Sequence, residues 1–560
     1  MNYTDNEIQR FKRQLQQSIV ICSDRCLYNS TKWSAEVLDG VKEEMLDKSN
    51  QYEHQNTYST NYDASLPSFN EVEYNKYQYA KSLFHVRQYE NVSFILRDLN
   101  NPRLRFLRLY ASYLAGEKHK EEQSQDILGA NDNSLAENPQ LNSIYKELRT
   151  AYNAKQPLDA FCLYLYGVVL RKRGNDQSAA SILLESIRKY EYNWSAWTEL
   201  GCLVQNKKMF YDLQKVLDAT LPNCLMKNFF LGRLSLDLHQ PHSTYCDIME
   251  PLTKIFPDST YIKAQWAISL YDTMDYNESE VLFDDLRKTN PYRLEDMDVF
   301  SNLLYLKDSK QKLSMLAHQC ERIDKYRPET CCIIANYYSI KREIPVSIEY
   351  FKRALKLNRS YHWVWTLLGH DYIEMKNTSA AIECYRRAID YNHRDFRAWY
   401  GLGQAYEVLK LPYYAIYNYQ NAADLRPHDD RMWQALGGCY TQLQLDDSAS
   451  TCYRRAARCD QEGRHNAVIF LARIYDRMTK YDMAAYYYLQ AFEQFEQDDH
   501  YGDEVAESAL YLANYLVSRN ELENVERFAK AAQDYGFPYR DQAQAILDKI
   551  KDMPHSSSQD

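Results

Sequence analysis

One pattern of four side chains recurs along this chain at a constant spacing, and it constrains the fold more than any other feature. The pattern reads Trp365, Leu368, Gly369 and Tyr372, then Trp399, Leu402, Gly403 and Tyr406, then Trp433, Leu436, Gly437 and Tyr440. Offsets of three, four and seven place each set on one face of a helix. An alanine follows at the same distance in each copy, as Ala381, Ala415 and Ala449. The spacing therefore predicts repeated helix pairs.

This arrangement resembles the tetratricopeptide repeat (TPR), whose period of about 34 residues equals the step from one tryptophan to the next. In such a repeat, the glycine of helix A and the alanine of helix B allow close packing, while aromatic side chains fill the space between neighbours. A single pair cannot bury its apolar face alone, so the pairs stack into a superhelix with a concave groove. We therefore predict an all-α fold, a TPR superhelical solenoid.

More degenerate copies extend the repeats in both directions, with a single inserted residue after the three clear copies. Polar or charged stretches poor in aliphatic residues interrupt them. We expect an N-terminal helical segment at 1–51, a polar linker at 52–71, an N-terminal TPR array at 72–327 with a charged loop at 117–140, a C-terminal TPR array with a groove at 328–535, and a helix with a flexible tail at 536–560.

Composition excludes several classes of function. The chain carries 67 basic and 77 acidic residues without long single-sign blocks, so the basic footprint of a nucleic-acid-binding protein is missing. No segment approaches the roughly 18 consecutive apolar residues of a membrane span, and the amino terminus lacks the apolar core of a signal peptide. The 13 cysteines are expected to be reduced thiols. The 50 tyrosines favour a surface for proteins.

Three candidate chemical sites are each better explained by packing. Gly401 and Gly403 flank a leucine as in phosphate loops, but they lack the third glycine and the preceding strand. Cys22 and Cys26 lie one helical turn apart without a second pair of ligands. The cluster of His239, His242 and Cys246 is interrupted by a proline and lacks a fourth ligand. We expect no cofactor, no metal and no catalytic activity.

Longer blocks of sequence are more specific than the TPR period. The blocks YRPETCCIIANYYSI, NPYRLEDMDVFSNLLYL and FLRLYASYLAGEKHKEE, and above all MKNTSAA at 375–381, resemble the family of the eighth, or cell-division-cycle twenty-three, subunit of the anaphase-promoting complex (cyclosome). The resemblance runs from about residue 75 to about 535. It implies a scaffold subunit of a multi-subunit ubiquitin ligase that acts in mitotic exit, in the nucleus and cytoplasm. It further implies a homodimer through the N-terminal repeats, stacking on other TPR and scaffold subunits, and a C-terminal groove for the basic C-box peptide of the coactivator.

The repeat register predicts which side chains face that groove. Counted from three residues before the tryptophan, helix A positions two, five, nine, twelve and thirteen face it; they include Asn336, Trp363, Thr366, His370, Glu374, Arg397, Tyr400, Gln404, Glu407, Arg431 and Gln434. Asn336 and Gln404 can hydrogen-bond a peptide backbone. Glu374 and Glu407 can pair with the guanidinium groups of a basic motif.

A second reading is a TPR co-chaperone that binds the acidic tails of heat-shock chaperones. That class uses a clamp of basic and amide side chains. Here Glu374 and Glu407 stand beside Arg397 and Arg431 on the predicted face, so an anionic tail gains no clear advantage over a basic peptide. Co-purifying partners distinguish the two readings.

Overall fold

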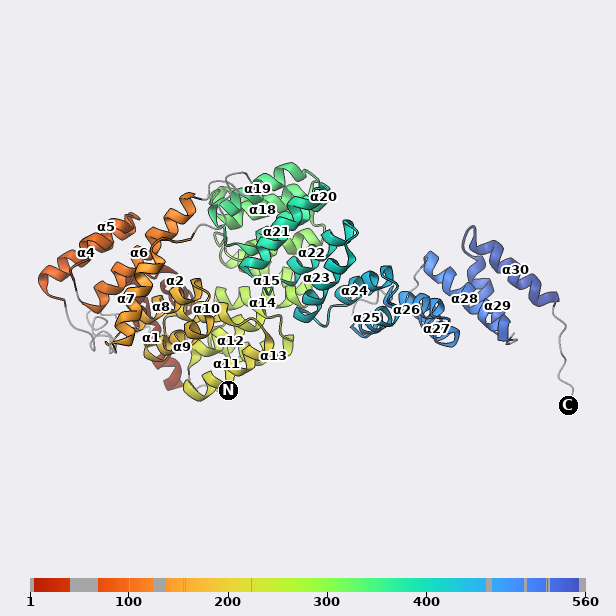
Figure 1. Ribbon diagram of the computed structural model, residues 1–560, viewed down its shortest axis with the longest axis horizontal. Helices are drawn as coiled ribbons and strands as arrows, with labels where there is room; N and C mark the ends of the chain where they lie inside the picture. The colour runs from red at the N-terminus through yellow and green to blue at the C-terminus, as the bar shows by residue number, and fades with distance from the viewer. Residues whose placement is uncertain are drawn as a thin grey trace. The chain divides into compact units, whose positions relative to one another are not determined.

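The computed structural model describes residues 5–40, 69–99, 101–123, 128, 137–154, 156, 158–222, 224–459, 466–497, 501–519, 521 and 524–552. Every regular element in these ranges is a helix, which confirms the predicted all-α solenoid class (Figure 1). The chain divides into two compact units, residues 1–364 and 365–560.

Unit 1 begins with a helical hairpin and continues as helix pairs. Its helices are α1 (Asp5–Asp24), α2 (Tyr28–Asp39), α4 (Glu71–His85), α5 (Tyr89–Ile95), α6 (Pro102–Gln123), α7 (Leu141–Asn153), α8 (Ala160–Lys172), α9 (Asp176–Lys189), α10 (Trp194–Leu203), α11 (Lys207–Thr220), α12 (Leu225–Asp237), α13 (His242–Ile255), α14 (Thr260–Asp272), α15 (Tyr276–Thr289), α16 (Met297–Leu306), α17 (Lys310–Ile323), α18 (Pro328–Ile340) and α19 (Ile344–Leu357).

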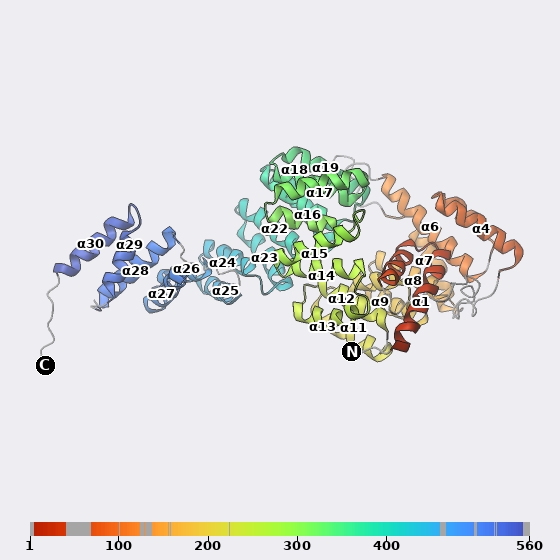
Figure 2. The ribbon, with the colours of Figure 1, turned by 180° about the vertical axis from the view of Figure 1, so that it is seen from behind.

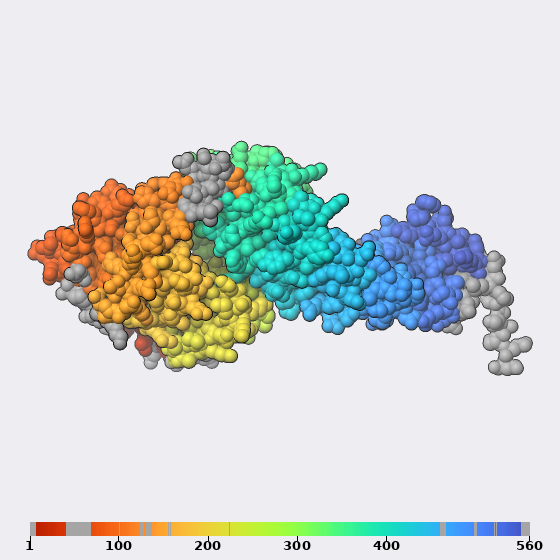
Figure 3. Space-filling model, in the orientation of Figure 1, coloured from red at the N-terminus to blue at the C-terminus, as the bar shows by residue number. Residues whose placement is uncertain are grey.

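Unit 2 contains most of α20 and all later helices. They are α20 (His362–Glu374), α21 (Thr378–Tyr391), α22 (Phe396–Val408), α23 (Pro412–Leu425), α24 (Asp430–Gln442), α25 (Asp446–Cys459), α26 (Asn466–Arg477), α27 (Tyr481–Gln497), α28 (Asp503–Arg519), α29 (Val525–Gln533) and α30 (Tyr539–Asp552). In the space-filling view the colours of this unit follow one another in chain order, because each repeat packs on its sequence neighbours (Figure 3).

The turn between helix A and helix B has the same backbone in successive repeats. A non-glycine residue with positive φ ends helix A at the evenly spaced positions Met274, Asp308, Arg342, Lys376, Lys410 and Gln444, and then at Thr479 after the single inserted residue. In the repeat of Lys376, the Asn377 amide donates to the Tyr372 carbonyl at 2.9 Å. This bond closes a Schellman cap, which satisfies a carbonyl at the end of the helix. The turn therefore preserves the repeat register even where the side-chain pattern weakens.

The repeat glycines of unit 2 make room for a tyrosine of helix B. A Cβ atom on Gly369 would lie 2.5 Å from the ring of Tyr385, and one on Gly403 would lie 2.6 Å from Tyr419. Gly401 has a separate reason, because its Cβ would lie 2.6 Å from the Tyr385 ring of the preceding repeat. Ala381, Ala415 and Ala449 are all fully buried. Both glycines of the 401–403 stretch are thus packing residues.

The tryptophans and helix A tyrosines make polar bonds as well as apolar contacts. Trp365 is fully buried beneath the Arg387 guanidinium, whereas Trp399 and Trp433 are half-buried. The indoles of these two donate at 2.9 Å to the carbonyls of His393 and Pro427. The preceding helix B also donates to the next helix A, from Arg386 to the Tyr406 hydroxyl at 2.7 Å and from Gln420 to the Tyr440 hydroxyl at 3.0 Å. These bonds link one repeat to the next.

In unit 1 the helical hairpin α1–α2 packs against α10, α12 and α14, the first helices (helix A) of successive helix pairs. These helices are called the helix A row. Trp33 stacks on Trp194 of α10 with ring centroids 4.0 Å apart, and its edge meets Phe229 of α12 and Tyr261 of α14. Helix α1, in red, lies beside α8 and α9 in both ribbon views (Figures 1 and 2). Phe11 of α1 contacts Phe256 with a centroid distance of 6.1 Å. The N-terminal segment is therefore part of the core of unit 1.

Polar and charged groups fix the same hairpin at both ends. Ser30 Oγ bonds to Ser195 Oγ at 2.8 Å, and Glu36 accepts from Arg293. Arg25 is almost completely buried, with its guanidinium 4.2 Å from the Phe161 ring centre and its Nε 3.7 Å from a carboxylate oxygen of Asp159. A buried charge needs such partners. These contacts therefore determine the position of the hairpin on the repeats of unit 1.

The predicted segments and the observed elements differ in two places. Helix α6 continues to Gln123, so the beginning of the predicted loop at 117–140 is helical; His119 pairs there with Glu90 at 2.8 Å. The boundary of the two units falls after residue 364, whereas the predicted arrays meet at 327–328. Most of the predicted linker at 52–71 and the tail after residue 552 lie outside the described residues.

Candidate peptide-binding groove

Helix A positions of α20, α22 and α24 supply the predicted groove residues of unit 2. Asn336 and Trp363 belong to unit 1, where both are buried, and the Asn336 amide donates to Ser301 Oγ at 2.8 Å. The others lie in unit 2, as Thr366, His370, Glu374, Arg397, Tyr400, Gln404, Glu407, Arg431 and Gln434. The side chains of His370, Glu374 and Gln404 are exposed, so they are open to a ligand.

Two buried aspartates, Asp395 and Asp429, bind groove side chains near the amino-terminal ends of α22 and α24. Asp395 accepts from the Arg397 amide at 3.1 Å and from Thr366 Oγ1 at 2.9 Å. Asp429, at the same position of the next repeat, accepts from Arg431 through Nε at 2.9 Å and through Nη2 at 2.7 Å. Both aspartates cap the helix that follows. Thr366 and Arg431 are therefore oriented by the capping carboxylates.

The electrostatics of Asp429 follow from this pairing. Burial acts to raise the pKa of its carboxyl group, but the hydrogen bonds and charge of Arg431 outweigh burial and hold that pKa below its usual value. The pair is therefore ionised at neutral pH. Asp395 and Asp429 were missed by the side-chain register, although an aspartate shortly before each helix, at the repeat spacing, is a visible capping signal.

A row of helix B tyrosines forms a second layer of the site. The Tyr385 hydroxyl is hydrogen-bonded to His370 Nδ1 at 2.8 Å, and the Tyr419 hydroxyl donates to Glu407 Oε2 at 2.9 Å. Burial and the Glu407 carboxylate raise the pKa of Tyr419, so its hydroxyl remains protonated and acts as a donor. The sequence pattern assigns these tyrosines to packing alone, but their hydroxyls also position groove side chains.

Both carboxylate oxygens of Glu407 have hydrogen-bond partners. One accepts from Tyr419, and the other accepts from Gln442 Nε2 at 3.2 Å. Tyr400 is half-buried with its ring centroid 5.4 Å from that of Tyr419, and the Gln434 amide donates to Asp430 at 2.8 Å. The face thus offers carboxylates, amides and an aromatic ring, which suit a peptide with basic side chains.

The candidate metal and thiol groups have other partners. His242 Nδ1 bonds to Ser269 Oγ at 2.9 Å, and His239 lies 3.5 Å from an Asp272 oxygen. Burial raises the pKa of the Cys22 thiol to about 12. Across the residues described above, no group of His, Cys, Asp and Glu side chains is arranged to hold a metal ion. In the same ranges, no helix combines the length and apolarity that crossing a membrane requires.

The stacked helix pairs with a polar concave face define the chain as a TPR solenoid protein. A TPR model matches residues 369–409, and the model of the family "Anaphase promoting complex subunit 8 / Cdc23" matches residues 10–267. The chain belongs to this anaphase-promoting complex subunit 8 / Cdc23 family.

Relatives from a plant and from Dictyostelium support the assignment to this family. The chain is 44% identical to anaphase-promoting complex subunit 8 of Arabidopsis thaliana, over 98% of this chain and 96% of the relative. It is 40% identical to the subunit 8 of Dictyostelium discoideum, over 98% and 99%. The crystal structure of the APC/C hetero-tetramer Cut9-Hcn1 matches 86% of this chain and 97% of that one, with a TM-score of 0.50 and 14% identity, which supports the fold alone.

Proposed function

We propose that this chain is a non-catalytic scaffold subunit of the anaphase-promoting complex, a multi-subunit ubiquitin ligase that controls mitotic progression and exit. Similarity to subunit 8 relatives along nearly the whole chain is the observation that carries the proposal. The chain acts by homodimerising, by stacking on other TPR subunits and by holding the C-box peptide of the coactivator. It works in the nucleus and cytoplasm. Fluorescence microscopy of a tagged copy in cells tests this location.

The surface of the α4–α5 helix pair supports homodimerisation through the N-terminal array. Val72, Tyr79, Val86 and Phe94 of α4 and α5 and the turn between them are 54–73% exposed. Several large apolar side chains exposed on one helix pair favour a protein contact. The family resemblance assigns dimer formation to the same array.

Capture from cells tests the scaffold role and the dimer together. We expect a tagged copy of the full chain to co-purify the other subunits of the ligase and a second copy carrying a different tag. Mass spectrometry and immunoblotting provide the measurement. Heat-shock chaperones without ligase subunits would favour the co-chaperone alternative, and absence of the second copy would remove the homodimer.

The groove of unit 2 supports binding of the C-box, because its carboxylates suit arginine side chains. We expect Glu374→Gln combined with Glu407→Gln to weaken binding of a labelled C-box peptide by about tenfold, since two charge-assisted bonds are lost. Fluorescence anisotropy with the full chain provides the measurement. Glu383→Gln on helix B of the same repeat is the matched control, because Glu383 pairs with Arg387. Equal losses in control and double variant would refute the site.

A further inference from the structure

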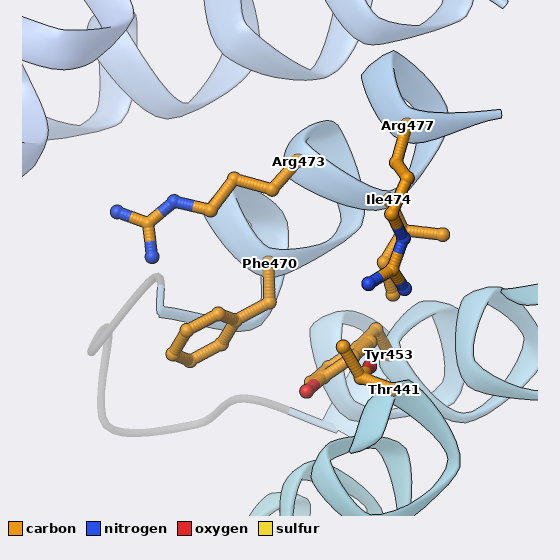
Figure 4. A pocket seen from close by; sticks show the side chains of 6 residues that line it. All are labelled: Thr441, Tyr453, Phe470, Arg473, Ile474 and Arg477. Atoms are coloured by element: carbon orange, nitrogen blue, oxygen red, sulfur yellow. The ribbon is translucent and has the colours of Figure 1, made fainter. Parts of the chain in front are cut away.

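A pocket lies beyond the predicted groove residues, at the packing of α24, α25 and α26. It has a volume of about 310 Å³ and is lined by Thr441, Tyr453, Phe470, Arg473, Ile474 and Arg477 (Figure 4). None of these residues belongs to the set predicted to bind a peptide.

The repeat register places this pocket on the same concave face. Thr441 occupies in its repeat the position that Glu407 has in the preceding one, and Tyr453 corresponds in the same way to Tyr419. With the single inserted residue, Arg473 takes the position of His370 and Gln404, and Arg477 takes that of Glu374. The pocket is therefore the continuation of the groove in the next repeat.

The floor of the pocket is apolar and partly open. Tyr453 and Ile474 are buried, while Phe470 is 37% exposed. The rings of Tyr453 and Phe470 lie with centroids 5.5 Å apart and planes 30° apart, so they form one surface. Such a surface suits an aliphatic or aromatic side chain of a ligand.

Two arginines from α26 flank this floor, and carboxylates hold both in place. Arg473 donates through Nε to Glu507 Oε1 at 2.8 Å and also through Nη2, while its guanidinium lies 5.5 Å from the Phe470 ring centre. Arg477 donates through Nη2 to Asp446, and Figure 4 shows its guanidinium directed toward Tyr453 and Thr441.

These ion pairs leave donors available to a ligand. Each guanidinium has five N–H groups in a fixed fork. In the described part of the chain, Nη1 of Arg473 and Nη1 of Arg477 make no hydrogen bond, and the two side chains are 41% and 42% exposed. Arginines already fixed by a carboxylate lose little further side-chain entropy on binding.

Basic groups enter the groove at the far end of unit 2. Glu374 and Glu407 face it in α20 and α22, whereas in α26 Arg477 takes the position of Glu374 and Arg473 takes that of His370 and Gln404. The position of Glu407 is taken by Asp476, which accepts from the Tyr511 hydroxyl at 2.9 Å. We propose that the pocket is a second subsite of the groove, which binds an apolar side chain next to an acidic side chain. The ligand of this groove then carries an acidic and apolar segment in addition to its basic one. This inference rests on the proposed peptide-binding function and extends it.

A pair of short peptides tests the subsite on the full chain. The probes are fluorescein-labelled Gly-Ser-Leu-Phe-Glu-Glu-Ser-Gly and its twin with both Glu replaced by Gln, each amidated at its carboxyl terminus. We expect the acidic peptide to bind about three- to tenfold more tightly than its twin, as partly exposed ion pairs allow. Arg473→Gln or Arg477→Gln should remove that difference, and Phe470→Ala should weaken both peptides alike.

Arg519→Gln is the matched control, because Arg519 is also a half-exposed arginine that pairs with one carboxylate, Asp482. Circular dichroism confirms that each variant keeps its helix content. Equal binding of the twins, or a difference that survives both arginine substitutions, would overturn the subsite. The same pair of peptides with a free carboxyl terminus completes the test. Tight binding of these two alone would also overturn the subsite, because the bound group is then the terminal carboxylate.

The C-box peptide separates failure of the subsite from failure of the proposed function. If the C-box peptide binds through Glu374 and Glu407 while the twins bind equally, only the subsite is wrong. If the acidic peptide binds through Arg473 and Arg477 while the C-box peptide does not bind, the subsite stands and the coactivator proposal fails.

Discussion

Replacing Trp33 with alanine is expected to detach the α1–α2 hairpin from the helix A row of unit 1. The indole is 5% exposed and stacks on Trp194 with planes only 8° apart, so its loss leaves a large cavity between aromatic rings. Removal of a buried tryptophan side chain costs about 3–5 kcal/mol. We expect the hairpin to separate as a local unit, without unfolding of the repeats.

Hydrogen exchange of the α1 and α2 amides measures this effect directly. We expect strong loss of protection in these two helices and near-normal protection in α18 and α19. Tyr292→Ala is the control, because that side chain is 77% exposed in the same unit. Unchanged protection of α1 would show that the polar bonds of Arg25 and Glu36 hold the hairpin without the tryptophan.

Replacing Asp298 with asparagine is expected to stabilise unit 1 at neutral pH and to make little difference in acid. Burial, with the nearby carboxylates of Asp296 and Glu329, raises the pKa of Asp298 to about 6, although the Tyr361 hydroxyl donates to it and opposes the shift. Since one pKa unit corresponds to about 1.4 kcal/mol and the pKa rises from about 4 to about 6, ionised Asp298 costs about 3 kcal/mol at pH values well above its folded pKa.

The sign of the pH dependence follows from the raised folded pKa. The contribution of Asp298 to stability is fully present below its unfolded pKa of about 4 and is lost as the pH rises through about 6. The free energy of unfolding of unit 1 should therefore fall between pH 5 and pH 7.5 more in the natural chain than in Asp298→Asn. Urea unfolding followed by tryptophan fluorescence measures it. Asp285→Asn, at an exposed position, should leave the pH dependence unchanged, and parallel curves for all three proteins would contradict the argument.

The helix pairs of unit 2 could be predicted because their contacts are local in sequence. Gly369 and Tyr385 belong to the two helices of one repeat and recur together at the repeat spacing, so periodicity alone points to their packing. The groove was only partly predictable. The register places Glu407 on helix A, but it does not show that Tyr419 of helix B donates to it. The arginines of the pocket were also missed, because one inserted residue shifts them out of the register that the glycines define.

The sequence by itself determined the class of fold, the repeat register and the family, because each depends on residues that are neighbours in the chain or repeat along it. Only the tertiary structure decided where the N-terminal segment goes. Its bond from Ser30 to Ser195 joins residues 165 positions apart, and its Trp33 contact with Trp194 is similarly distant. Such contacts follow no period, since they arise once, where a unique hairpin meets a repeated surface. The tertiary structure also decided which tyrosine hydroxyls and guanidinium groups reach the groove, because that depends on how neighbouring helices pack.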